Sequence, residues 1–299
     1  MVGSAVVRRL AREPVEILSV DHATLDLRDQ AAVRAFVGDM RPNKIVMAAA
    51  KVGGILANDA YPVDFLYDNL MIEANIIHAA HQAGVDHLVF LASSCVYPKF
   101  APQPIGEDAL LGGPLEPTNE WYAVAKIAGI KICQAYRKQY GRKYISVMPC
   151  NLYGPNDNFD LQTSHVLPAL IRKIHEAKEG GAKEVEIWGT GTPLREFLHV
   201  DDLADAIFFL MDRYDAAEPI NCGAGFDITI KELAERIARI IGFGGALVFD
   251  RTKPDGTPRK LMDSRRIATL GWKPRIGLDE GIAQTYRWFV ENMAAPAAG

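Results

Sequence analysis

The stretch HLVFLASSCVYP, residues 87–98, decides the fold that the sequence predicts. Its first half is a short run of large apolar residues, which is typical of a strand buried on both faces of a parallel sheet. Comparable apolar runs stand at three other places, residues 15–20, 44–50 and 144–153. Helices are predicted between these strands, at residues 29–40, 62–83 and 119–140. This alternation predicts an α/β protein with a doubly wound parallel sheet of the Rossmann type.

After about residue 160 the alternation gives way to segments rich in Asn, Asp, Gly and Pro. Three helices and one strand are predicted there, at residues 166–178, 201–211, 230–241 and 219–223. We therefore expect a dinucleotide-binding domain at residues 1–160. Residues 161–299 are expected to form mainly a smaller substrate domain, with segments near 197–222 returning to the first domain. The Ala/Pro tail after Asn292 is predicted to be disordered.

Composition excludes several classes of function. The chain has 299 residues, a net charge of −4, and no apolar run near the ~20 residues of a membrane helix. Nucleic acids and anionic membranes require a basic surface, so neither is expected as a partner. The four cysteines are scattered and form no CxxC pair: Cys95, Cys133, Cys150 and Cys222. No signal peptide is recognisable, and we expect a cytoplasmic protein without a metal site.

The stretch WYAVAKIAG, residues 121–129, carries the chemistry. Tyr122 and Lys126 are four residues apart on a predicted helix and share one face. An adjacent ammonium favours the phenolate, so the pair suits proton transfer at a carbonyl carbon that exchanges a hydride. By spacing alone, an exposed tyrosine and a solvated lysine are the commoner explanation. The strand ending in Ser93 and Ser94 favours catalysis, because open sheets bind ligands at the carboxyl ends of their strands, although both serines would also cap a strand end.

Longer motifs extend this interpretation along nearly the whole chain: AAAKVGGILAN (48–58), NIIHAAHQAGV (75–85), SSCVYP (93–98), LEPTNEWYAVAKIAGIK (115–131), NLYGPNDNF (151–159), SHVLPALIRK (164–173), WGTGTPLREFLHVDD (188–202) and KPDGTPRK (253–260). Together they resemble the GDP-L-fucose synthase family of extended short-chain dehydrogenases/reductases. The resemblance implies an NADPH-dependent epimerase-reductase acting on GDP-4-keto-6-deoxy-D-mannose. Inversion at C3 and C5 would be followed by reduction of the C4 ketone, giving GDP-L-fucose.

The resemblance also implies the catalytic residues. Ser93 would orient the substrate, Tyr122 would transfer the proton at C4, and Lys126 would support Tyr122 and hold the nicotinamide ribose. Cys95 and His165 would move the protons of the two inversions, since a thiol and an imidazole both titrate near neutral pH. Which of the two acts as the acid stays open. Their alternative roles are structural: a small buried hydrophobe for Cys95 and a helix N-terminal residue for His165.

Binding residues follow from the same resemblance. The cofactor would contact Gly3, Asp21, His22, Leu27, Leu91, Ala92, Ser93, Ser94, Lys126, Pro149, Cys150, Asn151, Leu152 and His165. The GDP-sugar would contact Lys173, Trp188, Arg195 and Asp255. An arginine fork and a lysine point charge suit a diphosphate, and an indole offers a flat face. Taken singly, surface charge and core packing are the commoner roles of such residues.

The cofactor preference departs from the family pattern. The stretch SVDHATLDL, residues 19–27, contains Asp21 and His22 and no arginine. An acidic residue after the second strand accepts the ribose hydroxyl of NAD and repels the phosphate of NADP. We expect NADP(H), with His22 or Arg28 compensating, and keep NAD(H) as the alternative.

The opening stretch, MVGSAVVRRLAREP, is the second departure. It looks like the first helix of a nucleotide-binding unit, with Gly3 as the last glycine of a glycine-rich turn. The first strand and two glycines are expected upstream of Met1. Strand order 3-2-1-4 would then leave an empty slot between residues 15–20 and 87–94, or the two strands would collapse together and misplace the helix at residues 4–12. Poor solubility and weak NADPH binding are the expected consequences.

Two further expectations concern assembly and the competing functions. The helices at 62–83 and 119–140 have broad apolar faces, and in this family such helices pair into a homodimer. Another nucleotide-sugar epimerase or reductase is the alternative in the same class. A catalytically impaired dinucleotide-binding protein is the alternative in a different class.

Overall fold

The main sheet of the protein has four parallel strands in the order β1-β2-β3-β8. The computed structural model describes residues 1–253 and 255–294. The strands are β1 (Lys44–Met47), β2 (His87–Leu91), β3 (Lys143–Pro149) and β8 (Ile220–Cys222). The prediction of a doubly wound α/β fold is confirmed.

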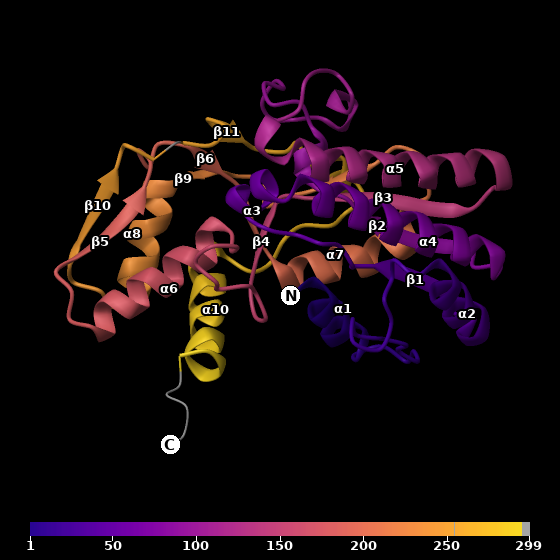
Figure 1. The fold of residues 1–299 in the computed structure, drawn as a ribbon, viewed down its shortest axis with the longest axis horizontal. Helices are drawn as coiled ribbons and strands as arrows, with labels where there is room; N and C mark the ends of the chain where they lie inside the picture. Colours follow the sequence, from indigo (N-terminus) through magenta and orange to yellow (C-terminus); the bar gives the residue numbers. More distant parts are fainter. Residues whose placement is uncertain (254, 295–299) are drawn as a thin grey trace.

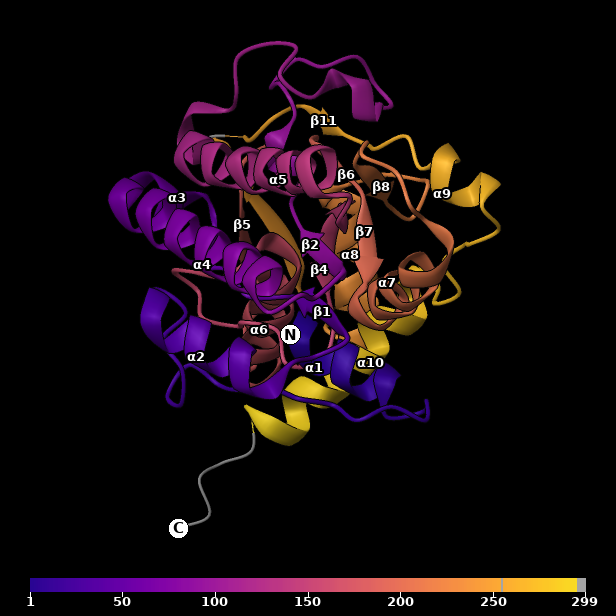
Figure 2. The same ribbon diagram turned by 90° about the vertical axis from the view of Figure 1, so that its right-hand side faces the viewer.

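Helices cover both faces of this sheet, as Figures 1 and 2 show. One face carries α4 (Asn69–Gln82) and α5 (Glu120–Tyr140), and the other carries α1 (Val2–Leu10) and α7 (Val200–Arg213). At the edge, α2 (Gln30–Met40) packs beside α4. Local signals set the helix ends. The Asp29 side chain accepts a hydrogen bond from Ala32 N at the start of α2, and Gly141 ends α5 with a φ of 71°.

The predicted strand at residues 15–20 is wrong. The segment has no strand structure, and Val15, Leu18 and Val20 are exposed. A strand needs a neighbour for its backbone hydrogen bonds, and no described segment pairs with this one. Apolar content alone therefore does not place it in the sheet.

The expected empty slot is also wrong. β1 pairs directly with β2, with Lys44 opposite His87 and Met47 opposite Phe90. Residues 44–47 therefore hold the edge position of the described sheet, and no gap separates them from residues 87–91. The strand order assumed from the sequence placed the wrong segments next to each other.

A second group of elements lies at one end of the molecule (Figure 1). The parallel pair β5 (Glu184–Trp188) and β10 (Ala246–Asp250) packs with α6 (Val166–Glu179), α8 (Ile230–Ile241) and α10 (Leu278–Asn292) around a hydrophobic core of their own. Phe197 belongs to this second core, and Leu198 belongs to the core of the main sheet. We propose that these two cores are the two predicted domains, with the segment from Leu198 to Cys222 returning to the first. The predicted disordered tail falls largely on residues 295–299, outside the described residues.

Short strands connect the two parts. β4 (Asn151–Tyr153) pairs with β7 (Phe197–His199). β6 (Leu194–Arg195) pairs with β9 (Ile228–Thr229) on one side and with β11 (Arg259–Lys260) on the other. The register of the last pair sets Lys260 opposite Arg195, so two cations from distant segments lie side by side.

Candidate active site

Tyr122 and Lys126 lie one turn apart on α5, beside the end of β2. Lys126 is buried, and its Nζ donates a hydrogen bond to the carbonyl of Leu91 over 3.0 Å. The same nitrogen lies 5.8 Å from the centre of the Tyr122 ring and 3.0 Å from Oε1 of Glu73 on α4. The fold therefore brings the two predicted side chains to the strand end where ligands bind in this type of sheet.

The environment of Tyr122 favours its neutral form. Burial is the largest cause that raises the pKa of Tyr122, and the charges of Cys95 and Glu73 raise it further. The hydroxyl of Ser93 acts in the opposite direction. The ring packs edge-on against buried Phe65, with 6.5 Å between the ring centres. A phenol that keeps its proton at neutral pH can donate it to an oxygen that gains charge.

Ser93 and Cys95 follow β2 in a short turn. Ser93 Oγ accepts a hydrogen bond from Cys95 N over 3.2 Å and caps the 3₁₀ turn η2 (Ser94–Val96). The capping role considered for the serines is therefore real for Ser93. It also fixes the Ser93 hydroxyl and the Cys95 sulfur relative to each other at the end of the strand.

Two side chains that the sequence did not single out contact the sulfur of Cys95. Asn119 Nδ2 donates to Cys95 Sγ over 3.1 Å, and Lys260 Nζ lies 3.7 Å from the same atom. In both contacts the sulfur accepts from a nitrogen that carries N–H groups. Both residues stand inside quoted motifs, in the NEWY and TPRK segments, but only the folded chain brings them to Cys95.

His165 lies at the N-terminal cap of α6. Its side chain has exposed surface, yet surrounding atoms desolvate the ring enough to lower its pKa, and the charge of Lys260 lowers the pKa further. The loop before it is held by Gly54, whose N–H donates to Thr163 O over 2.8 Å. A Cβ at Gly54 would lie 2.8 Å from Ser164 O, so this close approach requires a glycine.

The four predicted GDP-sugar residues lie in the second part of the protein and the small sheet beside it. Lys173 Nζ stands 5.0 Å from the centre of the Trp188 ring, and Lys253 Nζ stands 5.4 Å from the same ring. Asp255 accepts hydrogen bonds from Thr190 N and Thr190 Oγ1, at 2.9 and 2.7 Å. These contacts set cations and a half-exposed indole on one surface.

Arg195 is partly buried, and desolvation is the main cause that lowers its pKa. The charges of Asp255, Cys95 and Glu116 oppose this shift. Its Nη1 donates to the carbonyl of Leu194 over 2.8 Å. The guanidinium is thus within electrostatic reach of both the Asp255 carboxylate and the sulfur of Cys95.

Most predicted nicotinamide-side residues stand where strands end. Leu91 ends β2, Ala92 follows it, Pro149 ends β3, and residues 151–152 begin β4. Asn151 Nδ2 donates to Glu196 O over 2.8 Å, which ties this region to the chain next to Arg195. Cys150 is buried, and its burial raises its pKa well above the usual range, so it acts as a small apolar residue.

The residues predicted to contact the adenosine part of the cofactor, Gly3, Asp21 and His22, lie on and after α1. Gly3 is on α1, and a Cβ there would be 4.0 Å from Ala48, next to β1. Asp21 and His22 are exposed in a turn after the segment that is not a strand. Asp21 Oδ1 accepts hydrogen bonds from Thr24 N and Thr24 Oγ1, which lower the pKa of Asp21. Its carboxylate is therefore engaged within its own turn.

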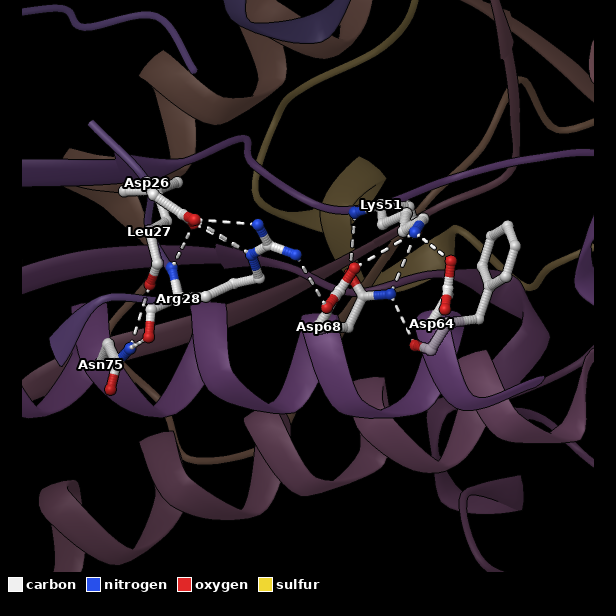
Figure 3. A network of polar contacts seen from close by, with 9 residues as sticks. Asp26, Leu27, Arg28, Lys51, Asp64, Asp68 and Asn75 are labelled. Atoms are coloured by element: carbon white, nitrogen blue, oxygen red, sulfur yellow. Dashed lines mark hydrogen bonds and ion pairs between the residues drawn. The ribbon is translucent and has the colours of Figure 1, made fainter. Parts of the chain in front are cut away.

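A network of charges links the loops on this flank to the helical segment η1 (Asp64–Asp68) and to α4, which follows it (Figure 3). Arg28 Nη2 pairs with Asp26 at 2.8 Å and Arg28 Nη1 pairs with Asp68 at 3.3 Å, and this holds the pKa of Asp26 at about 2. Lys51 pairs with Asp64 at 2.6 Å and with Asp68 at 3.1 Å. Arg28 is thus already paired with two carboxylates, while Leu27 and Arg28 accept hydrogen bonds at their carbonyls from Asn75.

Within residues 1–253 and 255–294, no group of three or more His, Cys, Asp or Glu side chains is arranged to hold a metal ion. The helices of that part of the chain include none with the length and apolarity needed to cross a bilayer.

Known proteins resemble the whole chain. The model of the NAD dependent epimerase/dehydratase family matches residues 1–223. GDP-L-fucose synthase 1 of Arabidopsis thaliana is 59% identical over 98% of this chain and 91% of its own length, and GDP-L-fucose synthase of Escherichia coli is 55% identical over 98% and 94%. A solved GDP-L-fucose synthetase from Naegleria fowleri, bound to NADP, has a TM-score of 0.90 at 29% identity and covers 98% of this chain and 92% of that one. The chain belongs to the NAD dependent epimerase/dehydratase family and, within it, to the GDP-L-fucose synthases.

Proposed function

We propose that this protein converts GDP-4-keto-6-deoxy-D-mannose to GDP-L-fucose with NADPH, by inversion at C3 and C5 and reduction at C4. One observation carries the proposal: a cysteine with two N–H donors on its sulfur follows β2 near the Tyr122–Lys126 pair, and the charge of one of those donors, Lys260, also acts on the pKa of His165. A plain reductase needs only the tyrosine and lysine. The additional acid-base groups are what two inversions require.

The residues at the end of β2 fit a nicotinamide nucleotide. Lys126 Nζ has three N–H groups: one donates to Leu91 O, and the ammonium lies 3.0 Å from Glu73 Oε1 as an ion pair. Another N–H group is available to a ribose hydroxyl. NADPH supplies the hydride that reduces the C4 ketone. Tyr122 donates the proton to the ketone oxygen, and the Ser93 hydroxyl donates a hydrogen bond to the same oxygen.

The inversions are assigned to Cys95 and His165. The sulfur of Cys95, with Asn119 and Lys260 as donors, removes the proton next to the ketone. The lowered pKa of His165 keeps a large neutral fraction at pH 7, so its imidazole can exchange protons in either direction. The GDP moiety is assigned to Lys173, Trp188, Arg195 and Asp255, with Arg195 next to the diphosphate because a guanidinium fork matches diphosphate oxygens.

NADP(H) is the proposed cofactor, in line with the NADP-bound relative from Naegleria fowleri. In the sequence, Asp21 argued against NADP(H), because a carboxylate at this position repels the phosphate of NADP. In the structure its Oδ1 faces Thr24, so the carboxylate is already engaged by two donors. NAD(H) remains the alternative that a direct titration with both nucleotides separates.

We also propose a homodimer formed by α4 and α5. Large apolar side chains are exposed on and beside these helices, Tyr67, Trp121 and Val124 among them. A groove runs between the helices and is lined by Ala74, His78, Ile132, Ala135, Tyr136, Gln139 and Tyr140. A cytoplasmic location is proposed because all four cysteines are free thiols.

Identification of the product tests the proposed reaction. The protein is incubated with GDP-4-keto-6-deoxy-D-mannose and NADPH, and the sugar nucleotide is isolated and its stereochemistry determined. GDP-L-fucose is the expected product. A reduced sugar with unchanged C3 and C5 would indicate a plain C4 reductase, and the absence of any reduced product would contradict the proposal.

A further inference from the structure

Glu73 is a buried carboxyl group that the proposed mechanism does not use. It lies in the middle of α4 with 1% of its surface exposed, and its Oε1 is 3.0 Å from the Nζ of Lys126. An unpaired carboxylate in such a place is strongly unfavourable, and a polar residue of the same size would cost much less. A buried ion pair therefore needs a reason other than stability.

The protein makes space for this carboxylate. Gly129 on α5 faces it, and a Cβ at that position would overlap with Oε2 of Glu73 and with the ring of Phe90. Lys126 Nζ lies 4.8 Å from the centre of the same Phe90 ring. The ammonium is thus enclosed by a carboxylate, an aromatic ring and the carbonyl of Leu91. These three neighbours hold the Lys126 ammonium in a single position next to Tyr122.

We propose that Glu73 is a positioning residue for the reduction step: its carboxylate holds the Lys126 ammonium beside Tyr122, and its charge sets the pH range in which Tyr122 donates a proton. The inference rests on the proposed function, since it concerns the proton transfer at C4. Two charges of opposite sign act on Tyr122. The nearby Lys126 ammonium favours the phenolate, and the Glu73 carboxylate opposes that effect.

The titratable groups around Glu73 support this coupling. Those that face it from α5 are Lys126, Tyr122 and Cys133, and its charge raises the pKa values of Tyr122 and Cys133. β2 presents the uncharged Phe90 ring and the Leu91 carbonyl. Burial raises the pKa of Glu73 to about 7, and Lys126 limits the rise. The charge of the pair therefore changes within the range in which the enzyme works.

A Glu73→Gln variant tests the inference through a pH profile. The amide keeps the size and an acceptor oxygen for Lys126, but it removes the negative charge that opposes ionisation of Tyr122. The basic limb of kcat for reduction is expected to shift downward by about one pH unit. A limb that stays in place, or one that shifts upward, would overturn the proposal.

Two controls separate this role from a structural one. Ile77→Val removes a methyl group from a fully buried position on the same helix, and is expected to lower the melting temperature without shifting the limb. Glu73→Asp keeps the charge and shortens its reach, so the limb should stay near that of the wild type while kcat falls. If the basic limb of the kcat profile shifted as far in Ile77→Val as in Glu73→Gln, the shift would be an effect of packing and the proposal would be overturned.

Infrared titration gives a readout that needs no substrate. The difference between wild type and Glu73→Gln should contain the carbonyl band of a protonated carboxylic acid, lost with a midpoint near neutral pH. Lys126→Met should move this midpoint upward, because the carboxylate loses its counter-ion. An unchanged midpoint would overturn the inference. Failure of the wild type to reduce the GDP-sugar would instead contradict only the proposed function.

Discussion

The side-chain amide of Asn119 donates a hydrogen bond to the sulfur of Cys95 over 3.1 Å. The two residues are 24 positions apart, Asn119 at the start of α5 and Cys95 in the turn after β2. Lys260 reaches the same sulfur from β11. Three separate segments of the chain thus converge on one sulfur atom.

Removing the proton donor should disable the reduction. Tyr122→Phe is expected to lower kcat by roughly 10²–10⁴, the usual contribution of one general acid-base group. Binding of the GDP-sugar should be unchanged, because Lys173, Trp188 and Arg195 remain in place. Steady-state kinetics and calorimetric titration with GDP measure the two effects. Turnover within a few-fold of the wild type would contradict the role of Tyr122.

Variants of Cys95 and His165 should affect the rate of inversion and the rate of reduction to different extents. Cys95→Ser and His165→Asn are expected to slow deuterium incorporation from solvent at C3 and C5 more than they slow hydride transfer. Each should release some reduced sugar that is not inverted or is inverted at one carbon. Mass spectrometry and NMR of the product give both quantities. Wild-type incorporation in both variants would leave Cys95 and His165 with structural roles only.

The hydrogen-bond donors to the Cys95 sulfur should also affect the rate of proton removal during inversion. Asn119→Leu removes the 3.1 Å hydrogen bond and is expected to slow solvent exchange at the carbon next to the ketone by up to about tenfold, since a hydrogen bond contributes roughly 0.5–1.5 kcal/mol. Asn292→Leu is the matched control, because it makes the same substitution at the exposed end of α10. Equal loss of exchange in both variants would count against the assignment.

Dimer formation should depend on the groove between α4 and α5. Ala135 is exposed in that groove, and Ala135→Arg places a charge where the proposed partner helix packs. The variant is expected to be monomeric at micromolar concentration while the wild type is dimeric. Analytical ultracentrifugation distinguishes the two states. A monomeric wild type would contradict the dimer directly.

Stability should respond to pH through Glu196. This residue is fully buried, accepts hydrogen bonds from Gly225 N and Met262 N, and has a pKa that burial raises to about 7. An unfolded glutamate has a pKa of about 4.3, so the folded protein binds the proton more tightly. The resulting stability is fully present below the unfolded value and is lost as pH rises through about 7.

The free energy of unfolding of the wild type, minus that of Glu196→Gln, should therefore fall between pH 5 and pH 8. Urea denaturation at three pH values measures this difference. The amide adds a constant offset, because its NH₂ group opposes one of the backbone N–H donors. A difference that does not change with pH would show that Glu196 titrates normally.

Sequence patterns predicted the elements whose signals are local. Helix α5 was found from its apolar spacing and its terminal Gly141, and the Tyr122–Lys126 pair followed because residues four apart share a helix face. The same reasoning failed for residues 15–20, whose apolar residues resemble a strand but have no neighbour to pair with. The predicted strand order was also wrong, because the amino-acid sequence of residues 44–47 does not indicate which strand pairs with this one.

By itself, the sequence determined the α/β class, the helix that carries Tyr122 and Lys126, and the strand end at Ser93, because each depends on interactions within a few residues. The contacts of Glu73 with Lys126, and of Asn119 and Lys260 with Cys95, were decided only by the tertiary structure. Glu73 reads as one polar residue in an amphipathic helix until α4 packs against α5. Lys260 reads as surface charge until β11 pairs with β6. Burial and charge pairing depend on these long-range contacts, and they set the chemistry of the site.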